Sequence, residues 1–170
     1  MRGRLIRSGL PLVLLGVMGV GVAMAATTSL QASGGTVKVV ASSKYGNVLA
    51  AGNGMTLYRY TPDRKGVSVC SGACAKYWPP LLLKGTAKAT AGPGASAALL
   101  GTIKRGSAKQ VTYAGFPLYF YAGDSKPGDV KGQGFAKTWY VVSAKGALVK
   151  QAAVPAPTTS TSKSSGSAWG

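Results

Sequence analysis

The acidic side chains are the first candidates for chemistry, because the chain holds only three of them and has no histidine or glutamate. They are Asp63, Asp124 and Asp129. Two carboxylates close together can share one proton and act as an acid–base pair, as in acid proteases. Neither Asp63 nor Asp124 lies in an Asp-Thr-Gly sequence, and 170 residues are too few for two protease lobes. We expect both to accept backbone N–H groups in Asx turns that fix the following loops, with a catalytic role as the alternative.

Asp63 and Asp124 end two copies of one sequence pattern. The frame Gly-x-x-Leu-Tyr-x-Tyr-x-x-Asp occurs twice, first from Gly54 and again from Gly115. The same offset aligns further residues downstream without a gap, which indicates an internal duplication. The aligned pairs are Gly54 with Gly115, Tyr58 with Tyr119, Tyr60 with Tyr121, Asp63 with Asp124, and Trp78 with Trp139.

The paired tyrosines of each copy are the next candidates. Side chains alternate along a strand, so Tyr58 and Tyr60 share one face, and Tyr119 and Tyr121 share another. We expect these rings to pack as a second layer beside the core, with each buried hydroxyl bound to one partner. The alternative is a pair of aromatic platforms that bind a sugar ring or a polymer chain.

The N-terminus has the pattern of an export signal. Three arginines precede an apolar run over residues 9–26, and Ala23-Met24-Ala25 is a small-x-small cleavage site. We expect residues 1–25 to be a signal peptide, so that no transmembrane segment remains after cleavage. An uncleaved anchor is the alternative, although Pro11 and four glycines make the run a poor spanning helix.

Export sets the chemistry expected of the only two cysteines, Cys70 and Cys74. Two nearby thiols outside the cytosol normally oxidise to a disulfide. A metal site would lack further soft ligands, and a thioredoxin-like centre has two residues between its cysteines rather than three. We expect a structural disulfide, with no metal and no cofactor. A redox or metal-handling module centred on this pair is the alternative.

The net charge of +17 is the strongest compositional signal. The 20 Lys and Arg residues are spread along the chain, without an arginine-rich run or the signature of a nucleic-acid-binding module. Such charge on an exported protein favours attraction to anionic polymers of the cell envelope, to phospholipid head groups or to extracellular DNA. Plain solubility is the alternative explanation.

The pattern of short β-rich segments predicts an all-β fold. Each copy reads as a hairpin, a loop and a Trp-bearing segment, and one copy alone buries too little surface to be stable. We expect two tandem 61-residue β units that share one core in a small antiparallel sandwich or a partly closed barrel. The expected domain is 37–151, with copies at about 45–84 and 106–145. A flexible leader at 26–36 and a disordered tail rich in Pro, Ser and Thr at 152–170 flank it.

The hairpin turn of each copy lies just before its tyrosines. Asn53-Gly54 predicts a two-residue type I′ turn, because both residue types accept positive φ. In the second copy Ala114 replaces the asparagine, so we expect its turn to differ in type.

These motifs together resemble one bacterial family. The two Tyr-x-Tyr-x-x-Asp motifs, the run from Cys70 to Leu81 and the stretch from Pro127 to Gly134 followed by Trp139 are similar to the "secreted repeat of unknown function" family, also described as predicted lipoproteins. The resemblance covers about residues 45–145. It implies an exported or envelope-associated protein made of tandem repeats, and it carries over no active site. The chain has no cysteine near its cleavage site, so it departs from the lipid-anchored members.

We therefore expect a secreted or envelope-associated protein without enzymatic activity that binds or scaffolds on anionic surface partners. An unrecognised extracellular enzyme is the rival class. It would have to perform general acid–base catalysis with Asp, Tyr or Lys alone, because the chain has no His and no Glu.

Overall fold

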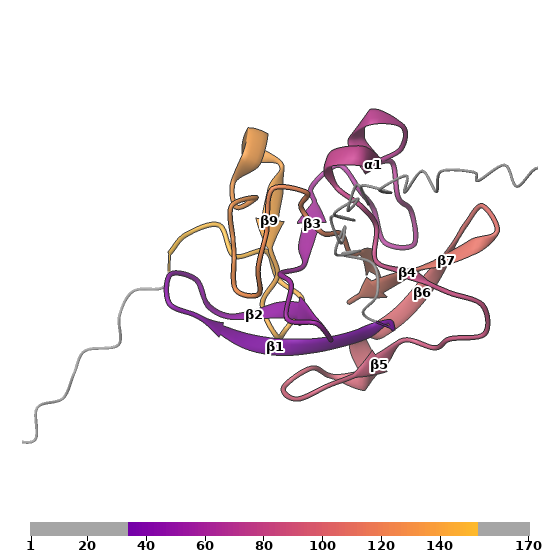
Figure 1. Cartoon of the computed structure of the whole chain (residues 1–170), viewed down its shortest axis with the longest axis horizontal. Coiled ribbons are helices and arrows are strands. Elements are labelled where there is room, and N and C mark those ends of the chain that lie inside the picture. Colours follow the sequence, from indigo (N-terminus) through magenta and orange to yellow (C-terminus); the bar gives the residue numbers. More distant parts are fainter. Residues whose placement is uncertain (1–33, 153–170) are drawn as a thin grey trace, which may run out of the picture.

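The computed structural model describes residues 34–152 of the chain. The expected signal peptide and nearly all of the expected leader and tail lie outside these residues and stay predictions. The described part consists mostly of short strands with very little helix (Figure 1). Several small sheets, antiparallel apart from one strand pair, form it, and within residues 34–152 they do not close into a barrel. The expected all-β class with two tandem units is confirmed.

The first repeat begins with a long hairpin and ends with a short strand. Its elements are β1 (Thr36–Ser42), β2 (Gly46–Ala51), β3 (Tyr58–Tyr60), the one-turn helix α1 (Ala73–Tyr77) and β4 (Leu82–Leu83).

The second repeat follows after a connecting segment, residues 84–99, and it too begins with a hairpin. That segment contains β5 (Thr90–Ala91) and the 3₁₀ turn η1 (Ala97–Leu99). The repeat itself comprises β6 (Leu100–Arg105), β7 (Ala108–Tyr113), β8 (Phe116–Pro117), the 3₁₀ turn η2 (Phe135–Lys137) and β9 (Trp139–Val141).

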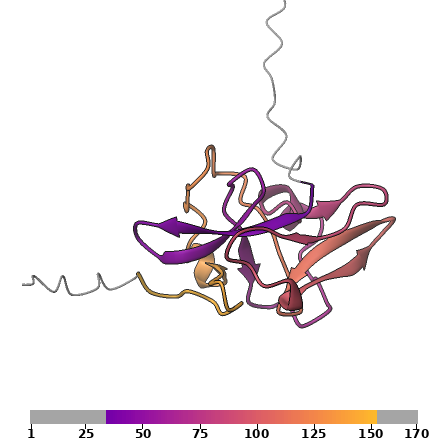
Figure 2. The same cartoon turned by 90° about the horizontal axis from the view of Figure 1, so that it is seen from below.

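Each repeat opens with an antiparallel hairpin, β1 with β2 and β6 with β7. Figure 2 shows the two hairpins extending toward opposite ends of the molecule. The inner strand of each hairpin is buried over four consecutive residues, Val48–Ala51 in β2 and Gln110–Tyr113 in β7, so both of its faces are covered. The outer strands β1 and β6 are mostly half-buried. β5 extends the first hairpin as a parallel neighbour of β1.

The last strand of each repeat pairs with the other repeat. β9 of the second repeat pairs with β3 of the first, and β4 of the first pairs with β7 of the second. The motif tyrosines show the symmetry directly, since Tyr58 pairs with Val141, and Tyr119 pairs with Pro80, the repeat equivalent of Val141. Tyr58 and Tyr119 also exchange backbone hydrogen bonds of 2.8 and 3.0 Å with each other. The repeats are thus interlocked about a pseudo-twofold axis between the two tyrosines.

The interior divides into a mainly aliphatic part, which also holds Tyr113 and Phe120, and an aromatic part. The aliphatic part lies between the two hairpins and combines leucines and valines of both repeats, including Leu49, Leu57, Leu81, Val111 and Leu118. The aromatic part lies around the pseudo-twofold axis and contains Tyr58, Trp78, Tyr119 and Trp139, with Cys70 at its edge. Neither repeat could bury these residues alone, which is the physical reason for the interlocking.

The hairpin turns reverse the prediction made from their sequences. Gly54 alone has positive φ in the first copy, and a hydrogen bond of 2.8 Å from its N–H to the carbonyl of Ala51 closes a three-residue loop. The Oδ1 atom of Asn53 accepts the N–H of Met55 at 3.2 Å, so this asparagine stabilises the loop by a side-chain bond. The two-residue turn with two positive φ angles occurs in the second copy, at Ala114 (51°) and Gly115 (83°). The asparagine–glycine prediction was therefore wrong for the first copy.

The difference between the two turns changes the alignment of the repeats. β2 is followed by Gly52 and Asn53 before its turn glycine, Gly54, whereas β7 is followed by Ala114 alone before Gly115. The second loop is therefore shorter by a single position. The alignment without a gap holds from the two turn glycines onward, and the preceding strands align only after a shift by that one position.

Candidate functional site

The tyrosine and aspartate of the repeated motif meet across the pseudo-twofold axis. The hydroxyl of Tyr58 donates to Oδ2 of Asp124 at 2.7 Å, and the hydroxyl of Tyr119 donates to Oδ2 of Asp63 at 2.5 Å. Each tyrosine thus binds the aspartate of the other repeat. The sequence pattern indicated all four residues but not this exchange between the repeats.

The second oxygen of each aspartate holds the following loop. Oδ1 of Asp63 accepts the backbone N–H of Val69 at 2.8 Å, and Oδ1 of Asp124 accepts that of Lys131 at 2.9 Å. These bonds agree with the expected loop-fixing role. They reach six and seven residues ahead, so each carboxylate closes a whole loop rather than a tight Asx turn.

All four side chains are buried, and burial governs their ionisation. Asp63 and Asp124 are 5% and 2% exposed, and both tyrosines have no exposed surface. Loss of water around the carboxylates raises the pKa of both aspartates, although the tyrosine hydroxyls and backbone N–H groups oppose this effect. Burial, followed by the adjacent carboxylate, raises the pKa of Tyr58 and of Tyr119 far above its usual value. The tyrosines therefore stay neutral and act as hydrogen-bond donors.

One of the two Tyr–Asp pairs is extended into a longer chain of hydrogen bonds. The guanidinium of Arg105 donates to the hydroxyl of Ser68 at 2.5 Å, and the hydroxyls of Ser68 and Tyr119 lie 2.7 Å apart. Because the single Tyr119 proton goes to Asp63, Ser68 must donate to Tyr119. Arg105 also donates to Gln110 at 2.9 Å and to the carbonyl of Cys70. Strand β6 of the second repeat thus anchors the cysteine loop of the first, a contact that no sequence pattern indicated.

The aromatic residues of the motif form one continuous stack. Trp78 and Trp139 lie face to face with ring centroids 3.9 Å apart and planes 2° apart. Tyr60 stacks on Trp139 at 4.3 Å, and Tyr121 covers Trp78 at 4.4 Å. Each tyrosine packs on the tryptophan of the other repeat. The rings therefore hold the repeats together, as the packing interpretation expected, and Tyr58 and Tyr119 present no surface to a sugar or polymer.

The cysteine pair lies at the edge of this aromatic part. Cys70 and Cys74 are bonded, with an S–S distance of 2.01 Å and Cα atoms 5.3 Å apart. The bond closes the loop that leads into α1 and Trp78. Within residues 34–152, no three side chains of His, Cys, Asp or Glu come together in a way that could hold a metal ion.

Charge is distributed very unevenly between interior and surface. Residues 34–152 contain 16 Lys and Arg, of which 13 are exposed, while none of the three aspartates in this range is exposed. Asp129 is the most accessible of them, and the N–H of Ser125 together with Lys131 holds its pKa at about 2. Its carboxylate forms an ion pair with Lys131 at 3.2 Å. The described surface is therefore cationic almost everywhere.

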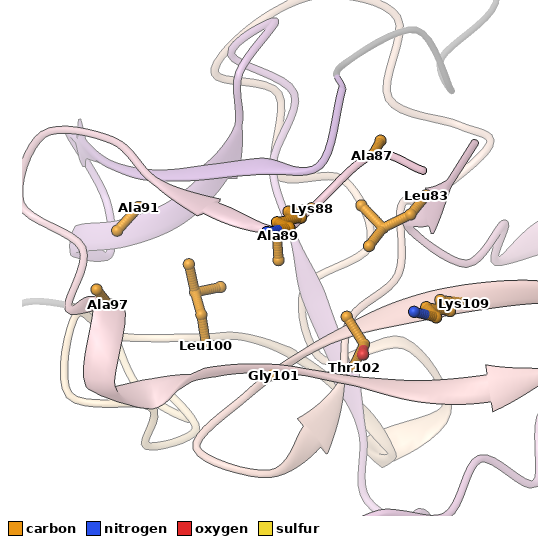
Figure 3. Close-up of a pocket in the computed structure, with 10 residues that line it drawn as sticks. All are labelled: Leu83, Ala87, Lys88, Ala89, Ala91, Ala97, Leu100, Gly101, Thr102 and Lys109. Atoms are coloured by element: carbon orange, nitrogen blue, oxygen red, sulfur yellow. The ribbon is translucent and has the colours of Figure 1, made fainter. Parts of the chain in front are cut away.

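The surface is hollowed beside the segment that connects the repeats. A hollow of about 310 Å³ lies between that segment and β6, and Figure 3 shows its lining. An adjoining hollow of about 370 Å³ shares Leu83 and Lys109 with it. The lining combines small apolar side chains with Lys84, Lys88 and Lys109.

Comparison with known families decides the identity of the repeats. The family described as "secreted repeat of unknown function" matches the chain twice, at residues 39–82 and 101–143. The chain belongs to this family. No curated protein and no solved structure matches it.

The two matched segments of the secreted repeat coincide with the interlocked units. Both contain the motif tyrosines, the motif aspartate and the tryptophan, and the second segment is shorter than the first by a single position. The missing position corresponds to the turn of the second copy, which is one residue shorter than that of the first. The family description as secreted agrees with the expected export. In residues 34–152, no helix is long and apolar enough to cross a bilayer.

Proposed function

We propose that this secreted repeat is a non-enzymatic binding domain that attaches to anionic polymers of the cell envelope through its cationic surface. The observation that carries the proposal is the separation of charge. Asp63 and Asp124 are held inside the fold, so the exposed lysines and arginines have almost no acidic partner at the surface.

The charge pattern supports binding more than solubility alone. With 16 basic and three acidic side chains, residues 34–152 carry a net charge of +13, and like charges at this density destabilise a compact fold through repulsion. A polyanion removes that repulsion and releases the counterions condensed on it, so association becomes favourable at low salt. The rigid, interlocked core keeps the lysines on a fixed surface, which lowers the entropic cost of binding.

Burial of the motif supports a structural role for Asp63 and Asp124, the residues that an acid–base enzyme would need. Both motif carboxylates are occupied by a tyrosine hydroxyl and a backbone N–H, and neither is accessible to a substrate. A general acid or base must reach the proton that it transfers. We therefore assign the Tyr–Asp pairs to folding and the lysines to function.

Salt-dependent binding tests the proposal. The exported protein is titrated with poly(glycerol phosphate), with single-stranded DNA and with vesicles rich in anionic lipid, each at several salt concentrations. We expect binding at low salt, a linear fall of log K with log salt, and near-complete loss by about 0.5 M salt. Absence of binding to every polyanion at low salt would show that the charge serves solubility only.

A further inference from the structure

The two adjoining hollows form one groove beside the segment that connects the repeats. Its walls are β4, the 84–91 segment, and the β6–β7 hairpin of the second repeat. The connecting segment lies between the two repeats, and within residues 34–152 no strand like β5 follows the second repeat. The groove thus breaks the pseudo-twofold symmetry of the domain, and a ligand that fits it would bind at one place and in one orientation.

The groove is lined by three lysines and by small apolar side chains. Lys109 lies in both hollows, Lys84 lines one and Lys88 lines the other. In Figure 3 the Lys109 side chain extends toward Thr102, while Ala91, Ala97 and Leu100 form the opposite end. No acidic side chain lines either hollow, and the one ion pair within residues 34–152 joins Lys131 and Asp129 instead. The three lysines thus concentrate positive charge that the protein itself does not neutralise.

The types of lining residue narrow the chemical class of the ligand. The groove contains no aromatic side chain, whereas proteins that bind single-stranded nucleic acids stack the bases on aromatic rings. It contains no arginine, so it lacks the planar fork that binds carboxylate or phosphate through two parallel hydrogen bonds, and its lysines bind phosphate as point charges instead. Separate lysine ammonium groups suit single negative charges spaced along a chain. The methyl groups of alanine and leucine suit the short CH₂ segments between such charges.

From these features we infer that the groove beside the repeat connection binds a linear phosphodiester polymer with small aliphatic units, of the poly(glycerol phosphate) kind, through Lys84, Lys88 and Lys109. The inference rests on the proposed function and gives it a location. The phosphates lie against the three ammonium groups, and the glycerol carbons lie against the apolar wall. Binding elsewhere on the cationic surface is weaker and does not depend on the type of polymer.

Two triple variants of the exported protein test this assignment, because each removes three positive charges from exposed sites. The groove variant is Lys84→Gln/Lys88→Gln/Lys109→Gln. The control variant is Lys44→Gln/Lys126→Gln/Lys145→Gln, in which Lys145 is the repeat equivalent of Lys84 and none of the three lines the groove. All six side chains are exposed, so both proteins should keep the wild-type circular dichroism spectrum and melting temperature.

The readout is the affinity for a poly(glycerol phosphate) oligomer at about 50 mM salt, with a single-stranded DNA of equal charge as the second probe. We expect the groove variant to lose at least tenfold in affinity for the oligomer and the control variant to lose less than threefold. The magnitude of the slope of log K against log salt should fall by about 2 for the groove variant alone, because each lost phosphate contact removes about 0.7 from it. For DNA both variants should lose equally.

Two outcomes separate a failure of the groove assignment from a failure of the proposed function. If the wild type binds poly(glycerol phosphate) and both variants lose the same affinity, the groove assignment is overturned, while the proposed function stands. If the wild type binds neither probe at low salt, the proposed function itself fails, and the groove assignment fails with it.

Discussion

The hydroxyl of Tyr58 donates a hydrogen bond of 2.7 Å to Asp124, which lies 66 residues further along the chain in the other repeat. Tyr119 and Asp63 repeat this contact with the roles of the repeats reversed. The repeated motif of this chain therefore forms a pair of crossed bonds that join its two copies.

A double-mutant cycle tests the crossed pairing. We expect Tyr58→Phe to lower the free energy of unfolding by about 1–2 kcal/mol, because the buried carboxylate of Asp124 loses a donor. The coupling energy between Tyr58→Phe and Asp124→Ala should be about 1 kcal/mol or more, and that between Tyr58→Phe and Asp63→Ala should be below about 0.5 kcal/mol. Urea unfolding measures both. Equal coupling to the two aspartates would contradict the crossed arrangement.

Separated repeats should not fold. In a fragment covering residues 34–95, β3 lacks its partner β9, and in a fragment covering residues 96–152, β7 lacks its partner β4. Each fragment also loses half of the aromatic stack. We expect neither fragment to show a cooperative thermal transition in circular dichroism, and we expect an equimolar mixture to regain the native spectrum. A cooperative transition in either fragment alone would show that a single repeat is self-sufficient.

Acidification should not weaken the fold between pH 7 and pH 4. Burial raises the pKa of Asp63 and of Asp124, so the folded protein binds protons more tightly than the unfolded chain, whose carboxyls have pKa values near 4. The stability linked to these protons is fully present below about pH 4 and is lost as the pH rises through the folded-state pKa values. We therefore expect a higher urea midpoint at pH 4 than at pH 7.

Asp129 opposes this trend only in stronger acid. Its pKa is lowered to about 2, so its contribution is present above about pH 4 and is lost as the pH falls toward 2. The variant Asp124→Asn should flatten the rise in midpoint between pH 7 and pH 4. Asp129→Asn should flatten it less, because burial raises the pKa of Asp124 more than the charge of Asp129 does. A wild-type midpoint that falls steadily from pH 7 to pH 4 would contradict the assignment.

The disulfide should contribute modestly to stability. A bond between residues four apart closes a very small loop, for which the chain-entropy model gives about 2 kcal/mol. We expect Cys70→Ser/Cys74→Ser to lower the free energy of unfolding by that amount and to leave polyanion binding unchanged. Mass spectrometry should show a gain of two hydrogens on reduction. Loss of binding after reduction would favour the redox alternative.

The two hairpin turns give opposite predictions for glycine and alanine. Ala114 has a φ of 51°, which costs an L-residue energy, so Ala114→Gly should raise stability by about 0.5–1 kcal/mol. Gly54 has a φ of 85°, and a Cβ there would lie 3.0 Å from Pro127, so Gly54→Ala should lower stability by more than about 1 kcal/mol. Thermal unfolding of the two variants checks both signs, and a destabilised Ala114→Gly would contradict the strain.

The sequence by itself determined the repeat, its strands and the residues that matter in it. The periodic tyrosines and leucines, the aspartate after each strand and the cysteine pair all depend on local spacing, which is visible in one dimension. Family membership follows from the same local motifs.

Only the tertiary structure decided which copy each residue contacts. The motif residues of the two copies are alike, so a bond between Tyr58 and Asp63 and a bond between Tyr58 and Asp124 agree equally well with the sequence. The choice depends on burial: a single repeat is too small to enclose its tyrosines and tryptophan, and exchanging the last strands lets both repeats enclose them together. The groove near Lys109 arises for the same reason, because interlocking brings the connecting segment against the second hairpin.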